Sequence, residues 1–157
     1  MRVLVGGVGY RNLRDESLGP HVSDVVAERA GDGIEVEDLS YGPVAVSHNL
    51  RDRPPYDRLV LVAAVRRGRA PGTIERYRWD AVLPPPEEIQ ARVTEAVTGV
   101  ISLDNLLVVC AAFGGLPDEV HVVEVEPGPE GWGEGFSPAV EARLPEVVEA
   151  VWSSTGP

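Results

Sequence analysis

The run Arg58–Val65, RLVLVAAV, would be apolar on both faces if it formed a strand. Strands of that kind lie in the middle of parallel sheets, where helices cover both faces. Other apolar runs alternate along the chain with segments of helical periodicity. The predicted strands are Arg2–Val5, Ile34–Leu39, Arg58–Val65, an edge strand at Thr73–Trp79, and Glu119–Glu126. The predicted helices are Leu18–Arg29, a short helix or turn ending near Leu50, Glu87–Val97, Ser102–Phe113 and Ser137–Val151, the last interrupted at Pro145.

This alternation of strands and helices predicts right-handed crossover units and a parallel sheet. We therefore expect an α/β fold: a three-layer sandwich with a mostly parallel, twisted sheet of about five strands and helices on both faces. The 157 residues fit one domain, 1–157. Such sheets bind ligands at the carboxyl ends of their strands. The loops that matter most are then Gly6–Gly19, Ser40–Val46, Ala63–Ala70 and Pro127–Phe136.

The charge balance excludes several classes of function. The chain has 14 Arg, no Lys and 25 acidic residues, for a net charge of −11. A protein this acidic lacks the positive surface that binds nucleic acid or an anionic membrane. Without Lys there is no Schiff-base lysine and no phosphate-loop lysine. We expect no nucleic-acid partner and no membrane partner.

The remaining composition predicts a cytoplasmic protein. The one cysteine, Cys110, lies in the apolar run LLVVCAAF and is expected to be buried. No apolar stretch reaches the ~18 residues of a membrane span. The first residues lack the long apolar region of a signal peptide, so a cytoplasmic location is the default.

The loop after the first strand, GGVGYRNLRDESLG, carries the first candidate chemistry. Asn12 breaks the G-x-G-x-x-G pattern, which weakens the hypothesis of a dinucleotide-binding domain. The acid pair Asp15-Glu16 directly precedes a predicted helix. An acid there is stabilised by the helix dipole, so a structural cap and a functional site both remain open.

Four segments, in order along nearly the whole chain, resemble the hydrogenase maturation endopeptidases. They are MRVLVGGVGYRNLRDESLG, YDRLVLVAAV with the following APGT, GGLPDEVHVVEVEP, and GFSPAVEARLPEVVEAV. The resemblance implies a phosphorylase/hydrolase-like α/β fold. It also implies removal of a C-terminal extension from the large subunit of a nickel–iron hydrogenase. The partner would be that large-subunit precursor or a related assembly protein.

The family's site, as the resemblance implies it, holds the nickel of the precursor with three ligands. These are a carboxylate in the first loop, an Asp that ends the central strand, and a His before the penultimate helix. Carried over by position, the first is Glu16, whereas Ala63 stands at the Asp and Gly99 at the His, counted back from Leu116-Pro117. One carboxylate is too few donors to hold a divalent ion tightly.

Three residues are candidates to assist Glu16. Asp15 is its neighbour, and His48 follows the second predicted strand. Arg66 begins the triplet Arg66, Arg67 and Arg69 after the central strand, where guanidinium groups could bind a carboxylate. For His48 and the arginines a solvated surface position is the plainer interpretation.

Two hypotheses about function follow, and the sequence leaves both open. In the first, the chain is a hydrogenase maturation protease-like enzyme that still processes a precursor. In the second, it is a pseudo-peptidase that binds a hydrogenase subunit or assembly factor without cleaving it. Trp132 and Phe136, in a Gly-rich acidic loop, are candidate partner anchors or loop-packing residues.

Overall fold

The computed structural model describes residues 1–157, arranged as five strands and seven helical segments. The strands are β1 (Val3–Val8), β2 (Ile34–Asp38), β3 (Arg58–Ala64), β4 (Ile74–Arg78) and β5 (Glu119–Val125). The α-helices are α1 (Leu18–Arg29), α2 (Pro43–Asp52), α3 (Pro86–Val97), α4 (Leu103–Phe113), α5 (Pro138–Glu141) and α6 (Leu144–Thr155). A short 3-10 helix, η1 (Arg14–Ser17), leads directly into α1.

The strands form one sheet in the order β2-β1-β3-β5-β4. All neighbours are parallel except β4, which runs antiparallel to β5 at the edge. The chain moves from β1 to β2 on one side and later to β3 on the other, so the order reverses between β1 and β3. Loops diverge at such a point and leave a crevice at the carboxyl ends of the strands.

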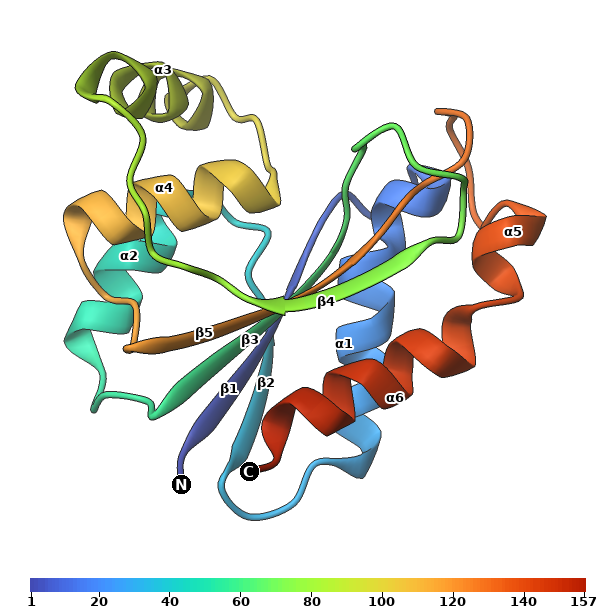
Figure 1. The fold of residues 1–157 in the computed structure, drawn as a ribbon, viewed down its shortest axis with the longest axis horizontal. Coiled ribbons are helices and arrows are strands. Elements are labelled where there is room, and N and C mark those ends of the chain that lie inside the picture. The colour runs from blue at the N-terminus through green and yellow to red at the C-terminus, as the bar shows by residue number, and fades with distance from the viewer.

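Two apolar cores lie on opposite faces of this sheet and make the fold a three-layer sandwich, as predicted. In Figure 1, α2, α3 and α4 lie on one side of the sheet and α1, α5 and α6 on the other. Leu61 of β3 belongs to the core under α2 and α4, and Val62 belongs to the core under α1 and α6. Central strand β3 is buried on both faces, which explains its uninterrupted apolar sequence.

The first strand is longer than the sequence indicates. The predicted strand, Arg2–Val5, ends before Gly6-Gly7, but β1 continues through both glycines to Val8. These glycines are needed for close approach rather than for a turn. A Cβ on Gly7 would lie 2.3 Å from the carbonyl oxygen of Gly19 at the start of α1. The missing side chain thus allows helix α1 to pack tightly on β1.

The last predicted helix is two helices. Helix α5 ends at Glu141, and α6 begins at Leu144 with Pro145 in its first turn. The predicted interruption at Pro145 is confirmed. Proline is tolerated in the first turn of a helix but not in its interior, so a new helix begins beside Pro145. Helix α3 packs on α4 and has no fully buried residue. No helix of the structure combines the length and the apolar character needed to span a membrane.

Candidate functional site

A pocket of about 150 Å³ opens where β1 and β3 end. The loop after β1 supplies Tyr10 and Glu16 to it, and the loop after β3 supplies Arg66. The start of α4 supplies Ser102 and Asp104. The apolar part of its lining includes Val8, Ala63 and Ile101. The pocket lies at the position that the sheet topology predicts for a ligand site.

Glu16 lines this pocket, as predicted, but its carboxylate is already paired. Its Oε1 accepts a hydrogen bond from Nη2 of Arg66 at 3.0 Å. The same guanidinium nitrogen donates to the carbonyl oxygen of Gly128 at 2.8 Å. Ala63 lines the same pocket, so the structure brings together Glu16, Ala63 and Arg66. Arg66, which follows the central strand, thus lies in the pocket lining beside Glu16.

Asp15 has a different role from its neighbour. Its side chain is fully buried and accepts hydrogen bonds from the backbone N–H of Gly128 at 2.7 Å and of Ser137 at 2.8 Å. The Ser137 hydroxyl donates a third bond, at 2.7 Å. Asp15 does not line the pocket, so its predicted accessory role is replaced by a structural one. It ties η1 to the loop between β5 and α5.

The structure does not bring Gly99 to the pocket, which corrects the predicted position of the third ligand. Gly99 is exposed in the turn after α3, with a φ of 93°. A Cβ built on it meets no atom within 4 Å. The pocket is lined instead by Asp104, in the first turn of α4. Sequence reasoning missed Asp104, although the predicted helix Ser102–Phe113 contains it. In the structure the Ser102 hydroxyl caps this helix by accepting a hydrogen bond from the Asn105 N–H.

His48 also lies away from Glu16. It is exposed on α2, and its Nε2 is 3.5 Å from the Asp52 carboxylate one turn later. It lines a separate surface pocket together with Tyr41 and Val97. The predicted accessory role for His48 in the Glu16 site is therefore not supported by the geometry, and the solvated interpretation is correct.

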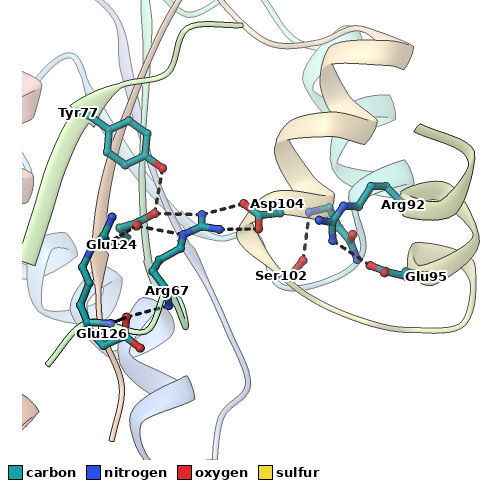
Figure 2. A network of polar contacts seen from close by, with 10 residues as sticks. Arg67, Tyr77, Arg92, Glu95, Ser102, Asp104, Glu124 and Glu126 are labelled. Atoms are coloured by element: carbon teal, nitrogen blue, oxygen red, sulfur yellow. Dashed lines mark hydrogen bonds and ion pairs between the residues drawn. The ribbon is translucent and has the colours of Figure 1, made fainter. Parts of the chain in front are cut away.

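A second arginine pairs with Asp104, the other acid of the pocket lining. Arg67 makes a two-pronged contact with Asp104, with nitrogen–oxygen distances of 3.0 and 2.9 Å. It also donates to Glu124 of β5 at 3.2 Å, as Figure 2 shows. The Glu124 side chain is only 2% exposed and receives further bonds from Arg69 and Tyr77. Burial alone would raise the pKa of Glu124, but these hydrogen bonds outweigh it and hold the pKa below its usual value.

Tyr10 and Ser40 fasten the loops around the pocket to one another. The Tyr10 hydroxyl accepts a hydrogen bond from the Ile101 N–H at 2.6 Å, which joins the loop after β1 to the start of α4. The Ser40 hydroxyl accepts from the Gly9 N–H at 2.9 Å. The loops that follow β1, β2 and α3 are thus held together at the carboxyl ends of the parallel strands.

The residues around the pocket do not fit a metal ion held by this chain. No three His, Cys, Asp or Glu side chains are grouped so that they could coordinate one. Ala63 offers no donor atom. The two carboxylates of the pocket, Glu16 and Asp104, each pair with a guanidinium group. Sites for transition metals need several free, deprotonated donors.

Comparison with known proteins identifies the family. No family model matches the chain. It is 30% identical over 155 residues to the hydrogenase 2 maturation protease of Escherichia coli (strain K12), covering 96% of this chain and 88% of that protein. The hydrogenase maturating endopeptidase HybD from E. coli matches with a TM-score of 0.72 and 26% identity, over 98% of this chain and 91% of the other. A hydrogenase 2 maturation peptidase from a Thaumarchaeota archaeon matches with a TM-score of 0.69 and 25% identity, over 99% of both chains. The chain belongs to the hydrogenase maturation protease family.

Proposed function

We propose that this chain is an endopeptidase that removes the C-terminal extension from the large-subunit precursor of a nickel–iron hydrogenase. The observation that carries the proposal is its similarity to a hydrogenase 2 maturation protease along almost the whole chain. The nickel in this reaction is part of the precursor, so it enters as substrate. The proposal places the reaction in the cytoplasm, the location expected from the sequence.

The surface beside the pocket supports a peptide substrate. A wider depression of about 480 Å³ adjoins it and is lined by Tyr10, Leu13, Glu16, Glu130 and Trp132. Tyr10 and Glu16 line both hollows, so the two share a wall. The precursor's C-terminal segment would lie across this shared wall, with Glu16 and Arg66 facing its backbone.

One observation favours a second candidate, binding of the precursor without cleavage. Ala63 stands at the carboxyl end of the central strand, where the sequence resemblance calls for an Asp. An alanine can neither coordinate an ion nor accept a proton there. The fold and the partner surface would persist without the reaction.

Incubation with a purified, nickel-loaded large-subunit precursor from the same organism tests the proposal. The expected result is a loss of mass equal to the C-terminal extension, measured by intact-protein mass spectrometry. Glu16→Gln should abolish the cleavage, and a precursor that ends at the mature C-terminus is the control for binding without a cleavable segment. A stable complex with an uncut precursor would establish the second candidate. Neither cleavage nor binding would refute both.

A further inference from the structure

We propose that the guanidinium groups of Arg66, beside Glu16, and of Arg67, against Asp104, serve as the resident cations of the two carboxylates in this pocket and keep free divalent metal ions from binding to them. The inference concerns the chain alone and does not depend on the identity of the precursor. It rests on two arginine–carboxylate pairs, each with its carboxylate in a wall of the pocket.

The first wall is the pair of Glu16 and Arg66. Arg66 is held on its other side by the Gly128 carbonyl and by the Glu130 carboxylate, which lies 3.5 Å from its Nε. Its guanidinium is therefore fixed from two directions beside Glu16. A metal ion bound to Glu16 would have to displace this arginine or accept its positive charge as a neighbour.

The second wall carries Asp104, which pairs with Arg67 from outside the pocket lining. Arg67 is anchored more firmly than Arg66, because its backbone N–H donates to Glu126 at 2.8 Å and its side chain also contacts buried Glu124 (Figure 2). Both oxygens of Asp104 face the guanidinium. The planar fork of arginine matches a carboxylate in this geometry and gives each of its oxygens a hydrogen bond.

Electrostatics then decides between arginine and metal. A unit charge about 4 Å from a divalent ion weakens its binding by about thirtyfold even at the dielectric constant of water, and by more in a protein pocket. One such charge, on Arg66, lies in the pocket lining, a second, on Arg67, lies against Asp104, and Ala63 provides no compensating carboxylate. The arginines thus supply the positive charge that the acids of the pocket require.

Calorimetric titration with Ni²⁺, repeated with Zn²⁺, tests this inference on the purified chain. The wild type should show no saturable binding up to millimolar metal. The variant Ala63→Asp/Arg66→Ala adds a carboxylate and removes a guanidinium, and it should bind in the micromolar range. The matched control is Ala63→Asp/Arg29→Ala, which removes an arginine paired with Glu149 far from the pocket. The test variant should bind at least about thirtyfold more tightly than this control. Addition of Glu16→Gln should abolish the gain.

Two outcomes would overturn the inference. One is micromolar binding by the wild type that Glu16→Gln removes. The other is equal affinity in the test and control variants, since the arginine would then exclude nothing. Circular dichroism establishes that each variant is folded before titration. No precursor takes part, so the result stands whether or not cleavage is observed.

Discussion

Glu124 is the residue whose protonation should lower the stability of the folded protein most directly at acidic pH. Its pKa is lowered in the folded state, because bonds from Arg67, Arg69 and Tyr77 outweigh the effect of burial. An acid with a lowered folded pKa stabilises the fold at pH values above its ordinary pKa. That stability is lost as pH falls through the folded pKa. We expect the free energy of unfolding to fall as the pH drops below about 4.5.

The variant Glu124→Gln isolates this effect. At pH 7 it should unfold with about 1–3 kcal/mol less free energy than the wild type, since it loses charge-assisted bonds to two arginines. The difference should shrink as the pH falls through the lowered folded pKa of Glu124, because the wild-type carboxylate then becomes protonated as well. Urea unfolding of both proteins between pH 7 and pH 3 measures this difference. A constant difference across that range would contradict the assignment to Glu124.

Truncation of two aromatic residues in one loop should change the free energy of unfolding by different amounts. The Trp132 residue is 82% exposed, whereas the Phe136 ring packs edge-on against His21 with ring centroids 5.2 Å apart. We expect Trp132→Ala to change the free energy of unfolding by less than about 0.5 kcal/mol, and Phe136→Ala to lower it by about 1–2 kcal/mol. Urea titrations of the two variants measure these differences. Equal losses would show that Trp132 packs in solution.

At this scale the sequence predicted the site only in part. Glu16 and Ala63 were placed by the resemblance to the family, and the sheet topology, which brings the ends of β1 and β3 together, accounts for their meeting in one pocket. Asp104 was missed, and Gly99 was misplaced. Gly99 was reached by counting back from Leu116-Pro117 across the whole of α4. That count does not account for the length of the turn between α3 and α4. The pairing of Arg66 with Glu16 depends on loop geometry that no local pattern specifies.

Among the elements, η1 depends on Asp15 for its attachment to the distant loop Pro127–Phe136. Asp15→Ala would leave two buried N–H groups and the Ser137 hydroxyl without their acceptor. We expect a loss of about 2–4 kcal/mol in the free energy of unfolding, together with faster proteolysis within that loop. Ser137→Ala is the milder comparison, because it removes only one of the three bonds. Limited proteolysis with mass mapping would contradict this role if the first cleavages in Asp15→Ala fell elsewhere.

The elements themselves were predictable wherever one physical rule controlled them. All five strands and the helices α1, α3 and α4 follow apolar periodicity, and the edge position of β4 follows its weak alternation. The rule failed at Gly6-Gly7. A pair of glycines signals a turn in local terms, but here it serves close packing of α1 on β1, and that contact lies outside any sequence window.

Over the whole molecule, two cores share one sheet, and this arrangement predicts how the protein unfolds. Leu61 of β3 lies in the core under α2 and α4, and Val123 of β5 lies in the core under α1 and α6. If the sheet unfolds, the apolar side chains of both cores become exposed to water together. Truncation on either face should therefore lower the stability of the whole chain in one cooperative transition.

Tryptophan fluorescence can follow each face separately. Trp79 packs on the first core and Trp152 on the second. Trp132→Phe removes the exposed emitter, and Trp79→Phe or Trp152→Phe in addition leaves one reporter. We expect Leu61→Ala to lower the free energy of unfolding by about 2–5 kcal/mol and Val123→Ala to lower it by a smaller amount, because less volume is lost. In each case the urea midpoint should be the same whether Trp79 or Trp152 is the remaining reporter. Separate midpoints, with only the reporter on the truncated face shifted, would mean that each face unfolds by itself and that the sheet does not couple them.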